Sequence, residues 1–196
     1  MRTTLAAALI ATLPLAAQAQ DRPQIYPTRD VAVTYRVSGG QTQGAEMTML
    51  WSAAQRLMRM NMPEGMGYMV ADQRNQRAFM VMEPTRMIMD VPAQQAAGPQ
   101  RELENARFTR GGTEKIAGYD CTVWRYPSAS GQGEACITSD GVMLRGAGAA
   151  RGAGNGRMEA TRVVYAAQDA SLFRRPQGYQ TMQMPQGMPQ GLATPR

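Results

Sequence analysis

A period of two runs through the first half of this chain. Met47 to Met62 reads MTMLWSAAQRLMRMNM, with methionine at alternate positions on either side of a short break. Successive side chains of a β-strand point to opposite faces of a sheet, so this period places alternate residues on one face. The same spacing suits copper(I), because thioether sulfur binds this soft ion. The pattern therefore allows two interpretations, a sheet face and a metal site.

The alternation extends over about sixty residues and predicts six antiparallel strands. Val31 to Val37 alternates Val, Val, Tyr and Val with Ala, Thr and Arg, and SGG then ends the strand. Five more strands are predicted in AEMTMLW, QRLMRMNM, YMVAD, QRAFMVME and PTRMIMDVP. Residues rich in Gly, Pro and Asn separate several of these segments, as expected for short turns. The predicted fold class is all-β with minor helix.

The second half predicts a helical connection and then a second block of strands. Residues 93–104 are the best helix candidate, although Gly98-Pro99 divides it. Strands are predicted around YDCTVWRY, EACITSDG and RMEATRVVYAAQ. The Gly/Ala segment at 146–156 predicts a flexible loop. Gln and Pro dominate the C-terminal residues, which predicts a disordered tail from residue 185.

The N-terminal residues predict export. A short basic start, an apolar stretch and the Ala17-Gln18-Ala19 site are typical of a signal peptide cleaved after Ala19. The apolar stretch is shorter than the about 20 residues that span a bilayer. We therefore expect a signal at 1–19, an irregular lead-in at 20–29, one β domain at 30–184 and a tail at 185–196. The mature protein is expected to be a periplasmic monomer and not an integral membrane protein.

The positive charge of the chain does not predict nucleic-acid binding, because the chain is expected to be exported. The formal net charge is +6, and loss of Arg2 with the signal would leave +5. Basic proteins often bind nucleic acid, but an exported chain meets little of it. An anionic envelope surface is the expected polyanionic partner. Scattered arginines that solvate the strand faces would explain the same charge without any partner.

The cysteines predict a disulfide, and the remaining side chains predict no enzyme. Cys121 and Cys136 are the only cysteines, and an even pair in an oxidising compartment indicates a bridge between neighbouring strands. The chain has no histidine, and Lys115 is its only lysine. The carboxylates are scattered rather than paired, so no acid–base site is predicted. We expect a non-catalytic protein without a cofactor.

Three features of the second half carry a resemblance to a known family. They are Ala117-Gly118 followed by Cys121, Cys136 followed by Asp140-Gly141-Val142, and Leu172-Phe173 followed by Pro176, Gly178 and Tyr179. In them the chain resembles an uncharacterised family of exported bacterial proteins, similar in fold to the lipoprotein carriers LolA and LolB. The resemblance implies an open antiparallel half-barrel with an apolar concave face and a helical lid. Carriers of this fold hold acyl chains on that face, and no catalytic residues come with the family.

The methionines then allow three functional interpretations. The first is an adaptable apolar face that binds an amphiphile, a lipid or a lipoprotein acyl chain, formed by Met47, Met49, Trp51, Met58, Met60, Met80 and Met82. The second is a copper(I) site formed by Met58, Met60, Met62 and Met66, although residues two apart on one strand are roughly 6.6 Å apart. The third is a structural envelope protein whose methionines fill an ordinary core.

Overall fold

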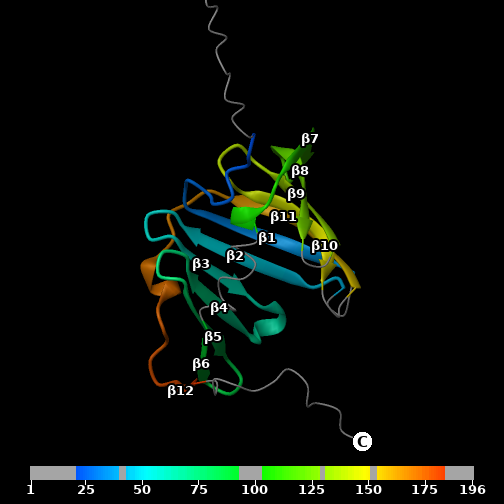
Figure 1. The fold of residues 1–196 in the computed structure, drawn as a ribbon. Coiled ribbons are helices and arrows are strands. Elements are labelled where there is room, and N and C mark those ends of the chain that lie inside the picture. Colours follow the sequence, from blue (N-terminus) through cyan, green and yellow to red (C-terminus); the bar gives the residue numbers. More distant parts are fainter. Residues whose placement is uncertain (1–20, 40–42, 93–102, 129–130, 151–153, 184–196) are drawn as a thin grey trace, which may run out of the picture.

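The strands of the chain form one open, curved β-sheet (Figure 1). The computed structural model describes residues 21–39, 43–92, 103–128, 131–150 and 154–183. Twelve strands in these ranges follow the order β12-β6-β5-β4-β3-β2-β1-β11-β10-β9-β8-β7. Their bounds are β1 Val31–Ser38, β2 Glu46–Ser52, β3 Leu57–Asn61, β4 Gly67–Asp72, β5 Arg77–Met82, β6 Met87–Val91, β7 Thr109–Ile116, β8 Tyr119–Ser128, β9 Gly131–Ile137, β10 Met143–Ala150, β11 Gly154–Val164 and β12 Gln180–Gln183. Two short 3-10 helices accompany them, η2 Pro63–Gly65 and η3 Ala170–Phe173.

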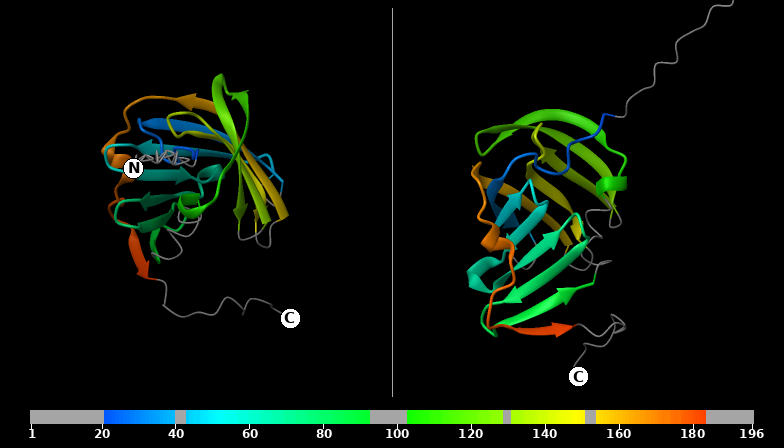
Figure 2. Two further views of the ribbon diagram at one scale, coloured as in Figure 1. Left: turned by 45° about the horizontal axis from the view of Figure 1, so that its top comes forward. Right: turned by 90° about the vertical axis from the view of Figure 1, so that its left-hand side faces the viewer.

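The sheet bends into a half-barrel. Figure 2 shows strands β7–β10 running steeply across the direction of β1–β6, with β11 between the two groups. A register shift between Thr34 and Tyr35 interrupts the β1–β11 pairing, and another follows Met143 in the β9–β10 pairing. Such bulges bend a strand and increase its twist. The structure therefore confirms the predicted all-β open half-barrel.

The first six strands form the predicted meander. Each of β1 to β5 pairs antiparallel with the next strand along the chain, which gives six strands in sequence order. The turn between β4 and β5 shows why the chain reverses where it does. One carboxylate oxygen of Asp72 accepts hydrogen bonds from the backbone N–H groups of Arg74 and Asn75, at 3.0 and 2.9 Å. An aspartate that bonds to the backbone two residues ahead is a common turn former.

Apolar side chains are buried in two main clusters. The larger one combines β1, β2 and the second block of strands, and includes Val33, Tyr35, Trp51 and Leu144. The hydroxyl of Tyr35 is satisfied there by donating to the carbonyl oxygen of Met143 at 2.7 Å. Fully burying a side chain such as Val33 contributes about 1.5–3 kcal/mol. The second cluster lies on β4–β6 and includes Tyr68, Val70, Val81, Ile88 and Phe173.

The expected disulfide is present between neighbouring strands. Cys121 on β8 bonds to Cys136 on β9, with their Cα atoms 5.4 Å apart. The bridge closes a loop with a sequence separation of 15 residues. By chain-entropy arithmetic, a loop of this size contributes about 3 kcal/mol to the free energy of unfolding.

The structure corrects one sequence-based expectation. The Gly/Ala segment at 146–156 is predicted as a flexible loop, but its residues 146–150 and 154–156 belong to β10 and β11, with Gly146 opposite Met158 and Gly148 opposite Gly156. Residues 151–153 lie outside the described residues. Residues just before the predicted tail form β12, which pairs in parallel with β6. Of the predicted helix at 93–104, residues 93–102 lie outside the described residues, and 103–105 are helical. The predicted signal and the predicted tail also lie outside them.

Candidate functional site

The register of the sheet gathers methionines from six strands on one face. Residues directly opposite each other in paired strands lie on the same face of a sheet. Met49 lies opposite Met60, Met60 opposite Met69, and Met69 opposite Met80. Met80 in turn lies opposite Met89, and Met89 opposite Met182. This row across β2, β3, β4, β5, β6 and β12 is called the methionine ladder below.

Further apolar rows lie on each side of the ladder. On one side Trp51 is opposite Met58, and that row continues through Ala71, Ala78 and Val91. On the other side Gly67 is opposite Met82, which is opposite Met87. Met47 occupies the corresponding place on β2, opposite Tyr35. The methionine face is formed by Met47, Met49, Met58, Met60, Met69, Met80, Met82, Met87, Met89 and Met182.

Most of the methionine face is half-buried. The nine members on β2 to β6 have intermediate exposure, whereas Met182 at the sheet edge is 51% exposed. Met49 and Met58 pack partly against the larger core cluster. The paired positions of these rows between β2 and β6 hold no charged side chain. The face is therefore a continuous apolar surface that is partly open to solvent.

The opposite face of the same strands is covered by the C-terminal part of the chain. Phe173 of η3 is buried against Tyr68, Val70, Val81 and Ile88, the residues that alternate with the methionines. The guanidinium of Arg59 donates to the carbonyl oxygen of Leu172 at 2.7 Å and lies over the ring of Tyr68, with its carbon 3.5 Å from the ring centroid. Burial lowers the pKa of Arg59 and raises that of Tyr68. The two faces of β3–β6 thus differ, one covered and one partly open.

The lead-in closes one end of the methionine face. The indole N–H of Trp51 donates to the carbonyl oxygen of Pro27, and the ring of Tyr26 stacks on the indole. The Tyr26 hydroxyl donates to Glu104 at 2.6 Å. Burial, helped by that bond, raises the pKa of Tyr26 to about 12, so the hydroxyl stays a donor at neutral pH. Trp51 itself is only 2% exposed, so it bounds the face as a core residue.

The structure brings together all seven residues predicted for the apolar face. Met47, Met49, Met58, Met60, Met80 and Met82 share one face, with Trp51 at its end. Sequence reasoning left Met69, Met87, Met89 and Met182 out of that set. Met69 could have been found from turn positions, because Met60 and Met69, and again Met69 and Met80, are equally distant from the turn between their strands.

The residues of the copper(I) alternative are less well gathered. Met58 and Met60 share one face of β3, whereas Met62 precedes η2 and Met66 follows it. Met66 is 50% exposed and lies outside the paired rows. Among the described residues, no three His, Cys, Asp or Glu side chains are arranged to hold a metal.

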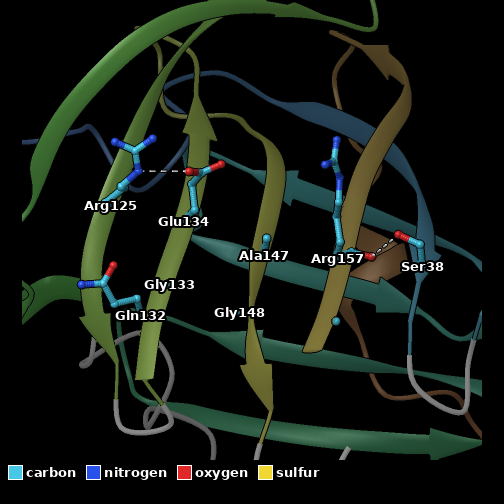
Figure 3. A pocket seen from close by; sticks show the side chains of 9 residues that line it. Ser38, Arg125, Gln132, Gly133, Glu134, Ala147, Gly148 and Arg157 are labelled. Atoms are coloured by element: carbon cyan, nitrogen blue, oxygen red, sulfur yellow. Dashed lines mark hydrogen bonds and ion pairs between the residues drawn. The ribbon is translucent and has the colours of Figure 1, made fainter. Parts of the chain in front are cut away.

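Two sizeable cavities lie away from the methionine face. The first, of about 510 Å³, is polar, and Figure 3 shows Arg125 and Glu134 on one side of it and Arg157 on the other. Arg125 is paired with Glu134 at 3.3 Å, and Arg157 is paired with Glu159. The second, of about 580 Å³, lies beside the covered face and is lined by residues that include Phe79, Phe173 and Arg175.

A buried charge network adjoins the first cavity, because Glu134 belongs to both. The guanidinium of Arg145 is 8% exposed and bonds to Glu114 and Glu134, at 2.8 and 3.2 Å. The bond to Glu114 raises the pKa of Arg145 despite its burial, and the same bond lowers the pKa of Glu114. Because the charges here already neutralise one another, this cavity offers little net charge to a ligand.

Comparison with known proteins places the chain in an uncharacterised group. Residues 32–145 match a domain of unknown function, DUF4412. No curated protein matches the chain. Within the described residues, no helix has both the length and the apolar character to span a membrane.

Solved structures share the fold at low sequence identity. An uncharacterized conserved protein from Thermus thermophilus is 13% identical with a TM-score of 0.58, over 80% of this chain and 91% of that one. In the Pseudomonas aeruginosa MucA/MucB complex the values are 13% and 0.53, over 83% of this chain and 62% of that one. A putative outer membrane lipoprotein-sorting protein domain from Vibrio parahaemolyticus is 10% identical with a TM-score of 0.39, over 76% of this chain and 91% of that one. The family match confirms the resemblance to an uncharacterised family, and the first two structures show that its fold occurs in other proteins.

Proposed function

This chain belongs to the DUF4412 family, and we propose that it is an exported, non-catalytic protein that binds an acyl chain or similar apolar group on its methionine face. One observation carries the proposal. An uncharged, half-buried row of methionines crosses six neighbouring strands, while the C-terminal segment covers the other face of the same strands. A continuous apolar surface that is partly open to solvent favours a role in binding apolar partners.

The chemistry of the face favours a long and flexible ligand. Methionine is unbranched and polarizable, so its side chain adapts to ligands of different shape. A stable core of strands would use mainly branched residues, as the covered face does with Val70, Val81 and Ile88. Each methylene buried on the face contributes about 0.8 kcal/mol before the costs of association. A chain of ordinary fatty-acid length therefore needs no charged anchor to bind.

The compartment proposed is the periplasm. The disulfide between Cys121 and Cys136 indicates an oxidising environment, since such bonds are rare in the cytosol. The signal proposed at residues 1–19 would deliver the chain there. A fatty acid, a lysolipid or the acyl chain of a lipoprotein are the ligands of matching chemistry in that compartment. A second protein is a further candidate partner, since the MucB structure of the same fold forms a complex with MucA.

The test is displacement of a fluorescent fatty acid by unlabelled fatty acids of increasing length. Affinity should rise about fourfold for each added methylene, as burial of one methylene requires. Met60→Glu and Met80→Glu should each weaken binding strongly, because they place a charge within the apolar rows. The matched control is Met66→Glu, which adds the same charge outside those rows and should leave affinity unchanged.

Leucine variants test whether fatty-acid binding depends on the apolar volume of the face or on its sulfur atoms. Met60→Leu and Met80→Leu keep the apolar volume, so fatty-acid binding should persist in both. Absence of displacement by every chain length in the disulfide-bonded protein would overturn the proposal. Equal loss in Met66→Glu and Met60→Glu would also overturn it, because binding would then not depend on the methionine face.

A further inference from the structure

We propose that the methionine ladder also binds a soft monovalent metal ion, copper(I), through the thioether sulfurs of Met60, Met69 and Met80. This site goes beyond acyl-chain binding and does not depend on it. The three residues come from β3, β4 and β5 and lie directly opposite one another in register. They form the centre of the ladder, with Met49 and Met89 as outer neighbours.

Methionines on neighbouring strands lie closer together than methionines on one strand, so their sulfurs can reach one ion. Along one strand, residues on the same face are roughly 6.6 Å apart and their side chains run parallel. Directly opposed residues on neighbouring antiparallel strands have Cβ atoms about 4.5–5.5 Å apart. Met69 lies between its two partners, and all three side chains have freely rotating methylenes. Three sulfurs can therefore lean toward one ion placed above Met69.

The residues next to Met69 on the same face are small. Ala71 and Ala78 lie opposite each other in the adjoining row, next to Met69 and Met80. Gly67 occupies β4 on the other side of Met69. The three methionines have intermediate exposure, so an ion can reach them from solvent. On this face of β4, Met69 therefore has only small residues before and after it, and no bulky side chain of β4 separates its sulfur from those of Met60 and Met80.

The surroundings favour a soft ion over a hard one. Magnesium and calcium need carboxylate or carbonyl oxygens, and the paired rows around the trio hold no carboxylate. The chain has no histidine, and both of its cysteines are in the disulfide. Thioether sulfur is then the soft donor that remains, and it selects copper(I). Nearby Arg59 lies on the opposite face of β3, where it bonds to Leu172, so its guanidinium points away from the trio.

The experiment is anaerobic competition between the disulfide-bonded protein and a chromophoric copper(I) chelator. One copper(I) should be withdrawn from the chelator per chain. The triple variant Met60→Leu, Met69→Leu and Met80→Leu should lose this binding, and each single replacement should weaken it by about tenfold. The matched control is Met47→Leu, Met62→Leu and Met66→Leu, which removes three thioethers outside the ladder and should retain it. X-ray absorption of the loaded protein should show sulfur as the only ligand type.

Several results would overturn the proposal. These are failure to compete with the chelator, equal loss in the two triple variants, or nitrogen and oxygen ligands in the absorption spectrum. Leucine keeps the apolar volume, so circular dichroism and the denaturation midpoint should match in both triples. The ladder triple should still bind fatty acids. Loss of copper with retained fatty-acid binding therefore separates this proposal from the function proposed above.

Discussion

The indole N–H of Trp51 donates to the carbonyl oxygen of Pro27 across 2.8 Å, which attaches the lead-in to the first strands of the sheet. The attachment is repeated at two other points. Asp30 accepts the backbone N–H of Ala53 at 2.7 Å, and the backbone N–H of Thr28 donates to the carbonyl oxygen of Asp140 at 2.9 Å. Residues 26–30 thus belong to the folded domain, although they form no strand.

Asp30 should be one of the more important polar residues for stability. Its two carboxylate oxygens accept the backbone N–H groups of Ala53 and Gln168, at 2.7 and 3.0 Å. A hydrogen bond to a charged group contributes about 1.5–3 kcal/mol. Asp30→Ala should therefore lower the free energy of unfolding by at least about 2 kcal/mol, measured by urea denaturation. Asp30→Asn keeps one acceptor, so its free energy of unfolding should lie between those of the wild type and Asp30→Ala. A wild-type free energy for Asp30→Ala would contradict this role.

Gly141 should tolerate no side chain. Its φ is +94°, and an added Cβ would collide with the carbonyl oxygen of Tyr26. Gly118 is the matched control, because its φ is +84° and nothing lies within 4 Å of an added Cβ. Gly118→Ala should cost only the backbone strain of about 1–2 kcal/mol. Gly141→Ala should cost clearly more in thermal or urea unfolding, and equal costs would show that the lead-in does not pack there.

Asp140 should make the protein less stable in acid. Its carboxylate accepts from Thr138 at 2.6 Å, Arg29 at 2.8 Å and Tyr165 at 3.2 Å. Partial burial opposes ionisation, but these bonds outweigh it and hold the pKa below the ordinary value of 3.8. The stabilisation is therefore complete above pH of about 4 and is lost as pH falls through the lower pKa of the folded state. Asp140→Asn should show a smaller loss of unfolding free energy between pH 6 and pH 2, and an unchanged slope would refute this.

Phe173 should hold the C-terminal segment on the covered face. It is 4% exposed and packs with Tyr68, Val70, Val81 and Ile88. Removing a buried phenylalanine side chain costs about 3–5 kcal/mol. Phe173→Ala should show a loss of that size in urea denaturation, whereas Met80→Leu on the other face should change stability by less than about 1.5 kcal/mol. A small effect of Phe173→Ala would mean that the segment contributes little to the fold.

The methionine face could largely be predicted from the sequence, because its period is local. Alternation along one strand is enough to place Met58 with Met60, and Met80 with Met82. Which residues lie opposite them depends on hairpin register, which is why Met69 was missing from the predicted set. Met182 needed more than hairpin geometry. Its strand pairs in parallel with β6 after some ninety intervening residues, and no local turn specifies that contact.

The predicted loop at 146–156 was wrong where glycine residues pair with a neighbouring strand. The segment at 146–156 is rich in glycine, which on its own favours a flexible chain. In the structure, Gly148 and Gly156 face each other across two strands whose backbones are paired. Backbone pairing does not need side chains, so neighbours of stronger strand propensity can impose it. The Trp51 contact with Pro27 was likewise beyond sequence reasoning, because a backbone carbonyl leaves no signature in the residue types.

The short β12 also affects whether the edge of the sheet can pair with strands of other chains. Without its four residues, β6 would end the sheet and present unpaired backbone N–H and C=O groups along an apolar Met-Ile-Met segment. Open edges of this kind are templates for strand addition between chains and for aggregation. A chain ending before Gln180 should therefore elute as larger assemblies in size-exclusion chromatography, while the full chain does not. The last pairing of the sheet, slight in its own energy, thus covers the apolar edge that β6 would otherwise present.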